Sequence, residues 1–529
     1  MSYSDSPQQQ PPWPQPGQPP AGQPPAWHPP HGGSPPGGQP RRGPVWLIPI
    51  AVVLSLAMMT TVVWASDSVV ENIFGGPQPE SVLPASSMAF AKADFKPTGA
   101  QLAAYGQFYS KLPDSVVEET GPQDQSFAEP LVTEMMPGVD FATEVEPWLG
   151  RRFGVSLWPT DAPEAMLSSN EGVSMAAAVA VTDEAQARES LTEIQRDSDF
   201  AFEVRDGFAL LSGNEAALDD LVAQVRNHGT LDSNPDYLSD MDTTGDDNIA
   251  SAWMDMNRWY EWISVSTSGE VPEELMAGMP EFTGRLVLAL RIEADYMQLR
   301  GDLLDFTFDG EPYEQLQSDQ AGISALEELP ANTVLGFGGG GLDQMARQAW
   351  QANRETLESL EGFAQFEEGL GALGISLPGD FTGLLGTRTA LGFTELSAGS
   401  DGWDTYGSMS QDLFHYRAVG ADQQMISELV NAIASGNYSE PPTVTGDGDA
   451  VLVYNESPGT GTLGEDAHFQ TTMVGLEQAN LGYYMKVAPF AEQSGMADAD
   501  QWGAIGGAVD YNTDSDVSIN LRWAPSGGR

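Results

Sequence analysis

The chain of 529 residues is 41 % hydrophobic and carries 76 acidic against 22 basic side chains, with no cysteine. The hydrophobic fraction suffices for several folded cores, whereas the negative charge disfavours nucleic acid because it would repel the phosphates. The absence of cysteine excludes disulfides, thiolate zinc sites and cysteine nucleophiles. An acidic, lysine-poor surface also keeps extracellular proteins hydrated at high salt, so the charge alone does not define a partner.

Residues 1–44 are rich in Pro, Gln and Gly, and the block GQPPA at 17–21 is repeated at 22–26. Such a composition cannot bury a core and predicts a disordered tail. Proline-rich segments adopt extended polyproline II, which aromatic grooves recognise, so the tail is either a flexible spacer or a docking segment.

Residues 45–65 read VWLIPIAVVLSLAMMTTVVWA, without a charge, and predict a single transmembrane helix. Trp46 and Trp64 lie near the ends of this segment, where indole rings anchor at the headgroups. Arg41 and Arg42 precede it, so the positive-inside rule places the tail in the cytoplasm.

A cleaved signal peptide is the competing interpretation, because Val63 and Ala65 are small residues of the kind that precede a cleavage site. The apolar stretch is longer than a signal core, and the tail precedes it, whereas export signals begin near the chain start. The sequence therefore favours an anchor in the plasma membrane, followed by a stalk at 66–80 and a large extracytoplasmic region.

Beyond the stalk, the chain contains two similar series of local patterns. Each series opens with Leu-Pro-Ala, at 83–85 and at 329–331, and continues with a helix-like segment. Four further blocks recur in the same order: 149–158 with 385–396, 176–194 with 414–433, 203–214 with 443–456, and 283–303 with 503–523.

These matches predict an α+β fold of two tandem similar copies, 81–303 and 326–529, with a connection at 304–325. Each copy is expected to form an antiparallel sheet with helices on one face. Each carries an amphipathic helix, with apolar stripes at Ala187, Leu191 and Ile194 and at Met425, Ile426, Leu429, Val430 and Ile433.

The usual signatures of catalysis are missing, since there is no HExxH pair, no GxSxG elbow and no SxxK motif. His415 and His468 are isolated in the sequence. Gly336, Gly338 and Gly341 satisfy GxGxxG, but the matching stretch of the first copy lacks these glycines and no ribose-binding acid follows. We therefore expect a flexible turn there, and no cofactor.

Acidic segments supply candidate calcium ligands. Asp240, Asp242 and Asp246 resemble the start of an EF-hand loop, although Ser251 stands where the bidentate Glu would be. The segment DYNTDSD at 510–516 is similarly acidic, but its pattern predicts a hairpin turn.

The order of tail, single apolar helix and the segment PESVLPASSMAFAKADFKP resembles uncharacterised actinobacterial membrane-anchored proteins that contain domain of unknown function 3352. In that family, the Leu-Pro-Ala opening is followed by a strand and a helix. The resemblance implies location and fold for nearly the whole extracytoplasmic region and carries no catalytic residues.

An anchored, duplicated extracytoplasmic region without a reactive constellation predicts a non-enzymatic protein of the cell envelope, with a binding or scaffolding role. The alternative is a carrier of a lipid or other apolar ligand, because curved antiparallel sheets backed by helices can enclose an apolar cavity. An extracytoplasmic hydrolase is a third possibility. The expected partners are the membrane and either an envelope protein or a lipid.

Overall fold

A computed structural model describes the chain in segments that begin at Gln78. They are residues 78–94, 99–120, 139–166, 172–196, 200–245, 248–266, 282–308, 310–312, 321–359, 362–372, 374–395, 413–437, 441–457, 459–512 and 515–527. The predicted tail, transmembrane helix and most of the predicted stalk lie outside these residues.

The described chain is a mixture of antiparallel strands and helices. The strands are β1 (Ala89–Asp94), β2 (Leu149–Pro159), β3 (Val173–Val181), β4 (Ala201–Arg205), β5 (Phe208–Ser212), β6 (Ala250–Asp255), β7 (Phe282–Ile292), β8 (Met297–Phe308), β9 (Glu311–Pro312), β10 (Leu335–Gly340), β11 (Arg388–Glu395), β12 (Leu413–Val419), β13 (Thr443–Asp447), β14 (Ala450–Tyr454), β15 (Leu481–Lys486), β16 (Ala504–Tyr511) and β17 (Val517–Ala524). The α-helices are α2 (Gly99–Tyr109), α3 (Asp114–Thr120), α5 (Glu184–Ile194), α6 (Glu215–His228), α7 (Pro235–Asp242), α8 (Met256–Ser266), α10 (Ile323–Glu327), α11 (Leu342–Ser359), α12 (Phe363–Ala372), α13 (Gly379–Leu385), α14 (Gln423–Asn437), α15 (Ala467–Met473) and α16 (Ala488–Gln493). Short helical turns are η1 (Pro79–Ser81), η2 (Phe141–Val145), η3 (Pro163–Ala165), η4 (Leu231–Ser233), η6 (Leu463–Glu465) and η7 (Ala499–Trp502).

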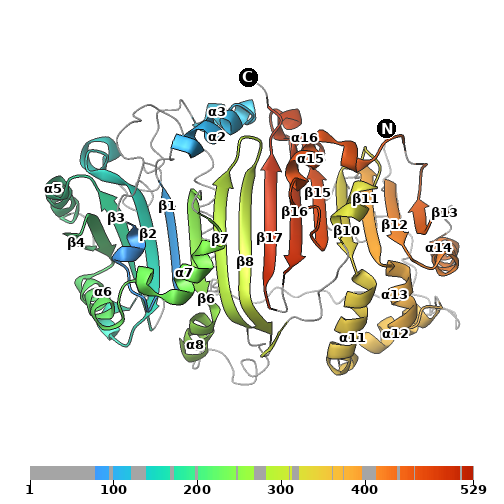
Figure 1. Ribbon diagram of the computed structural model, residues 1–529, viewed down its shortest axis with the longest axis horizontal. Coiled ribbons are helices and arrows are strands. Elements are labelled where there is room, and N and C mark those ends of the chain that lie inside the picture. The colour runs from blue at the N-terminus through green and yellow to red at the C-terminus, as the bar shows by residue number, and fades with distance from the viewer. Residues whose placement is uncertain are drawn as a thin grey trace, which may run out of the picture. The chain divides into compact units, whose positions relative to one another are not determined.

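All described strands belong to one sheet, and every described strand pair is antiparallel (Figure 1). The order across the sheet is β4-β5-β3-β2-β1-β6-β7-β8-β17-β16-β15-β10-β11-β12-β14-β13, and β9 pairs with the end of β8. The α+β prediction with an antiparallel sheet is therefore confirmed.

Read outward from the central β8–β17 pair, the strands of the two halves pair in the same order. This order is β8-β7-β6-β1-β2-β3-β5-β4 in the first half and β17-β16-β15-β10-β11-β12-β14-β13 in the second. The two Leu-Pro-Ala openings also occupy matching places, since Pro84 bridges to Thr230 and Pro330 bridges to Thr462. One difference is α6, because no helix is described between β14 and η6 in the second half.

Local sequence signals set the ends of several elements. The Asp183 carboxylate accepts hydrogen bonds from the amides of Ala185 and Gln186, which caps the start of α5. Strands β4 and β5 are joined by Asp206 and Gly207, both with positive φ, as a two-residue hairpin turn requires.

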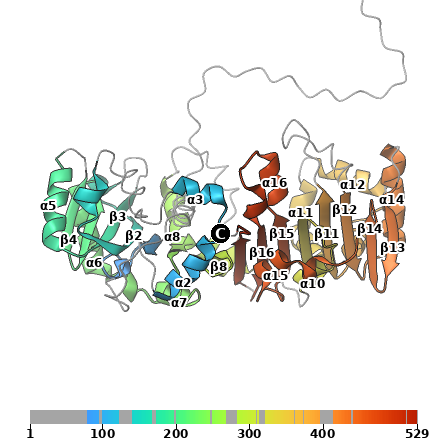
Figure 2. The ribbon, with the colours of Figure 1, turned by 90° about the horizontal axis from the view of Figure 1, so that it is seen from above.

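Helices cover both faces of the sheet, as Figure 2 shows from above. We call face A the side of Trp253 and Val287, against which η1, α6, α7, α10 and α15 pack. Face B is the opposite side, on which α5, α8, α13 and α14 pack. The prediction of helices on one face is wrong, because the inner strands carry apolar side chains in both directions.

The predicted apolar stripe of the first amphipathic helix is confirmed. Ala187, Leu191 and Ile194 are buried in one core with Val204 and Ala209. At the other end of the predicted first copy, β8 continues to Phe308, beyond residue 304, where the predicted connection begins.

The GxGxxG glycines lie mostly in a strand. Gly336 and Gly338 are within β10, and only Gly341, with φ 68°, is at the junction with α11, so the flexible-turn interpretation is wrong for the first two. Their role is close packing of α10, because a Cβ at Gly338 would lie 2.6 Å from the carbonyl oxygen of Gly322 and 2.9 Å from the Leu326 Cβ.

The substitution Gly338→Ala is expected to destabilise the fold by about 1–3 kcal/mol, because α10 must move to admit the methyl group. The matched control is Gly369→Ala in α12, where a Cβ meets no atom within 4 Å. That change is expected to be neutral or to stabilise by about 0.4–1 kcal/mol. Urea midpoints, measured by tryptophan fluorescence, test both, and equal midpoints for the two variants would contradict this account of β10.

Candidate ligand-binding groove

An apolar groove of about 620 Å³ lies on face B around the central strands. Strand register places most of its side chains on one side of the sheet, since Leu288 pairs with Gly301, which also pairs with Ile519. The lining residues are Leu286, Leu288, Leu299, Gly301, Leu303, Phe337, Gly338, Gly339, Leu342, Thr389, Leu391, Leu481, Gly482, Tyr483, Gly507, Ala508, Val509, Ile519, Asn520 and Leu521. We call this surface the central groove.

The central groove runs across strands rather than along them. Its lining comes from β7, β8, β17, β16, β15, β10 and β11, which are neighbours in that order, and from the first residue of α11. At about 4.8 Å between neighbouring strands, the lining spans about 29 Å. No residue of this lining carries a formal charge.

Glycines give the groove its depth. A Cβ at Gly507 would lie 2.6 Å from the Tyr483 ring, and one at Gly301 would lie 3.1 Å from a Leu288 methyl group. Large side chains of adjacent strands therefore fold over these glycines. Phe337 and Tyr483 stack with ring centroids 6.3 Å apart.

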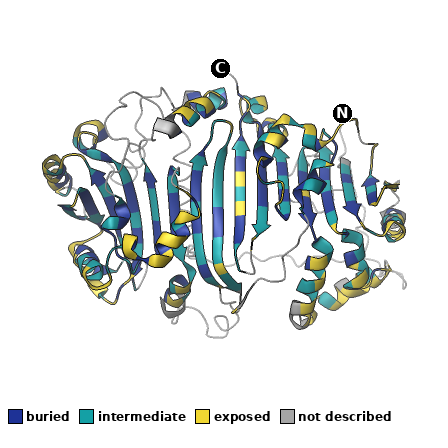
Figure 3. Ribbon diagram, in the orientation of Figure 1, coloured by how far each residue is buried: buried dark blue, intermediate teal, exposed yellow. Residues whose placement is uncertain are grey.

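The groove leaves large apolar side chains in contact with solvent. Phe337 is 47 % exposed, Ile519 44 % and Leu521 39 %, and Figure 3 shows the exposed stretch in the middle of β17. Contiguous exposed apolar surface of this kind usually marks an interaction site.

The two halves differ in how the helix that follows β1, α2, and the helix that follows β10, α11, pack on face B. In the first half, Tyr105 and Phe108 of α2 are buried in one core with Leu290, and Leu299 packs against that core. In the second half, α11 instead packs on its neighbours, with Trp350 and Phe363 of α12 5.8 Å apart. The central groove lies between these two helical segments.

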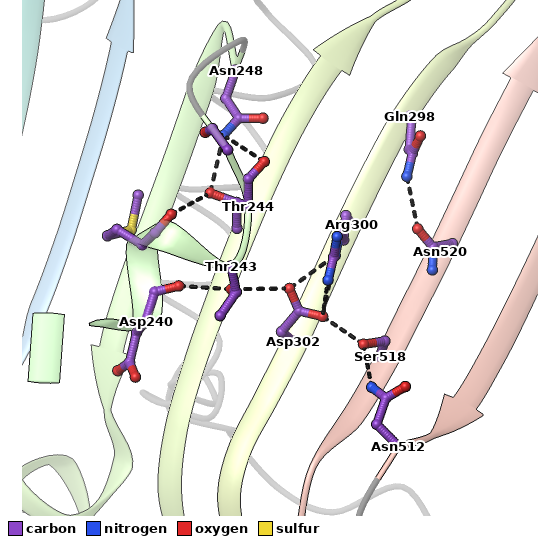
Figure 4. A network of polar contacts seen from close by, with 12 residues as sticks. Asp240, Thr243, Thr244, Asn248, Gln298, Arg300, Asp302, Asn512, Ser518 and Asn520 are labelled. Carbon is purple, nitrogen blue, oxygen red and sulfur yellow. Dashed lines mark hydrogen bonds and ion pairs between the residues drawn. The ribbon is translucent and has the colours of Figure 1, made fainter. Parts of the chain in front are cut away.

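Face A carries a polar network directly behind the groove (Figure 4). The Asp302 carboxylate pairs with Arg300 Nε at 2.9 Å and accepts a hydrogen bond from Ser518 Oγ at 2.6 Å. Gln298 Nε2 donates to Asn520 Oδ1 at 2.7 Å across the same strand pair. These contacts link β8 to β17.

Two of the three candidate calcium residues lie on a helix rather than in a loop of oxygen ligands. Asp240 and Asp242 lie on α7, and Asp246 lies outside the described residues. Asp240 is 2 % exposed, and its Oδ2 accepts hydrogen bonds from Trp253 Nε1 at 2.8 Å and Arg285 Nε at 2.7 Å. In the described part of the chain, no three His, Asp or Glu side chains are grouped to hold a metal ion.

The two histidines that a hydrolase could use, His415 and His468, lie on different elements, β12 and α15. His415 is buried in β12 and stacks on Tyr454, and burial lowers its pKa. His468 lies at the start of α15. The described residues around DYNTDSD join β16 to β17, where Asn512 N donates to the carbonyl of Asp516.

Apart from Gly338, which belongs to the GxGxxG pattern, the residues of the central groove were not singled out by the sequence. Their signal is alternation in β8 and β17, which predicts strands but not which face stays uncovered. Gly301 and Gly507 lack side chains, and this is the sequence feature that points to a depression in the surface of the sheet.

Comparisons with family models, with curated proteins and with solved structures gave no match. The resemblance to proteins with domain of unknown function 3352 stays a prediction. No helix among the described residues is long and apolar enough to cross a bilayer. The segment 45–65, with Arg41, Arg42, Trp46 and Trp64 in or beside it, lies outside those residues, so the anchor also stays a prediction.

The substitution Asp240→Ala is expected to destabilise the protein by roughly 3 kcal/mol, because it leaves the Trp253 indole N–H unpaired and removes one carboxylate from Arg285. Asp242→Ala, at an exposed position of the same helix, is expected to change stability by less than about 0.5 kcal/mol. Urea denaturation compares the two. A similar small loss in both would show that the buried pair does not stabilise α7 on the sheet.

Proposed function

We propose that this protein is a non-enzymatic, membrane-anchored protein of the cell envelope that binds an apolar ligand in the central groove. The observation that carries the proposal is the continuous uncharged lining, which crosses the middle of the sheet and remains partly exposed. Its volume falls within the range of about 300–1,000 Å³ that is typical of small-molecule sites.

The chemistry of the lining favours long hydrocarbon chains. Leu, Ile, Val and Phe side chains supply most of the contact surface, and glycines allow a flat or linear ligand to approach the backbone. Each methylene group moved from water into such a site contributes about 0.8 kcal/mol. A lipid chain lying across the strands would therefore gain affinity along most of the groove.

The predicted anchor would keep such a ligand within reach. Residues 66–77 would join the predicted transmembrane helix to the first described residue, Gln78. Twelve extended residues span at most about 43 Å, so Gln78 would stay within that distance of the end of the helix. This placement depends on the sequence prediction of the anchor.

A scaffolding role would need a protein partner to cover the same surface. A stable protein interface buries more than about 1,000 Å² and combines an apolar centre with a polar rim. The depth given by Gly301 and Gly507 suits a chain-like ligand better than a flat protein surface. No contact among the described residues supports a hydrolase.

We further propose that the two halves arose by tandem duplication. What supports this is the shared order of strand pairing, the matching bridges of Pro84 and Pro330, and the positive φ of Gly229 and Gly461 just before the matching η4 and η6 turns. The sheet then joins two copies edge to edge through β8 and β17.

Photo-crosslinking in the native membrane tests the proposed ligand. In the full chain, Phe337→p-benzoyl-phenylalanine places a reactive ketone in the groove, and irradiation is expected to give a lipid-sized adduct on that peptide. The same replacement at Leu238, which is 50 % exposed on α7 on face A, is the control and is expected to give no such adduct. Mass spectrometry distinguishes the outcomes, and a protein-sized adduct at position 337 would favour the scaffolding role instead.

The double variant Ile519→Asp with Leu521→Asp is expected to lower the yield of adduct at position 337 at least tenfold, because it puts two carboxylates in the groove. Both positions are solvent-exposed, so the fold should tolerate the change. Leu238→Asp serves as the matched control and should leave the yield unchanged. An unchanged yield in the double variant would place the bound molecule outside the groove.

A further inference from the structure

The single free hydroxyl group in the described lining of the central groove belongs to Tyr483. The other hydroxyl, that of Thr389, donates to the Leu385 carbonyl. The Asn520 side chain already accepts a hydrogen bond from Gln298, in the network on face A. Tyr483 Oη has no hydrogen-bond partner among the described residues, although the ring is well packed.

Packing fixes the Tyr483 ring in the groove. The ring lies over Gly507, in the place where a Cβ would be, and stacks on Phe337. A tyrosine phenol is protonated at neutral pH and can donate a hydrogen bond, and burial raises the pKa of the Tyr483 phenol further. A donor held in an apolar lining gains most from a ligand that brings an acceptor to it.

The charge of the surroundings excludes one class of lipid. A phosphate or carboxylate headgroup would need a basic partner, and the lining contains none. Arg347, on the helix that starts at groove residue Leu342, is already paired with Asp343. The excess of 54 negative charges over the whole chain adds long-range repulsion to this local deficit.

The donor is present in one half of the sheet only. Asp255 and Lys486 are equivalent, because each donates its amide to the residue before the matching strand β1 or β10. Counting back along β6 and β15, the counterpart of Tyr483 is Ala252, which has no polar side chain. A ligand with one polar end would therefore bind in one orientation.

We infer that the central groove selects a membrane lipid that lacks phosphate and carboxylate groups, whose hydrocarbon lies across the strands and whose carbonyl, ester or ether oxygen accepts a hydrogen bond from Tyr483. This inference rests on the proposed function and names the ligand class of the same site. Tyr483 is a binding residue in this account, and no covalent step is involved.

The test uses the full chain, with the photoreactive residue at position 337, reconstituted in phosphatidylcholine vesicles. The vesicles contain equal amounts of three guests with matched chain lengths: diacylglycerol, phosphatidylglycerol and a plain alkane. We expect diacylglycerol adducts to exceed phosphatidylglycerol adducts at least tenfold. An equal or greater yield of the anionic lipid would overturn the charge selection.

The variant Tyr483→Phe keeps the ring over Gly507 and removes only the hydroxyl group. It is expected to lower the diacylglycerol yield about fivefold and to leave the alkane yield unchanged, since the alkane has no acceptor. An equal fall for both guests would mean that Tyr483 acts only through packing and would overturn the hydrogen bond. Absence of any lipid or alkane adduct, with the variants folded, would instead reject the proposed function itself.

Discussion

The antiparallel pairing of β8 with β17 is the contact on which the rest of the described structure depends. Seven residue pairs, from Leu303 with Val517 to Met297 with Trp523, join the two halves into one sheet. Because side chains alternate, this register decides what each face of the junction presents. A slip of one residue would exchange Ile519 and Leu521 with Ser518 and Asn520, and the groove would lose its apolar floor.

Polar side chains on face A hold that register. Asp302 is 3 % exposed and would be costly to bury without Arg300 and Ser518. On the same face, the Arg522 guanidinium lies 4.5 Å from the centre of the Tyr296 ring and donates to the Thr472 and Val474 carbonyls. Burial lowers the pKa of Arg522, and these contacts offset part of the cost. The junction can therefore keep its alignment where the described residues cover face B only in part.

The sequence predicted local elements and their order better than it predicted their surroundings. Turn signals such as Asp206-Gly207 and the apolar stripe of α5 depend on neighbouring residues, so they can be predicted from the local sequence. The role of Gly338 was missed because it depends on how α10, which directly precedes β10 in the chain, folds back onto that strand. The groove was missed for a similar reason, since Ile519 and Leu521 form an ordinary strand pattern. Their exposure depends on where α2 and α11 lie.

The central groove exists because the two halves of the sheet are not fully equivalent. The helix after β1 buries Tyr105 and Phe108 over Leu290, whereas the helix after β10 packs on α12 and leaves its share of face B open. A duplicated fold with both helices docked would have a closed core and no groove. Because only α2 is docked on the sheet, the apolar surface of face B continues beyond the core and is partly exposed. The residues at equivalent positions differ in the same way. Tyr483 on β15 brings a hydrogen-bond donor to the open half, whereas the equivalent position of the other half is Ala252 on β6.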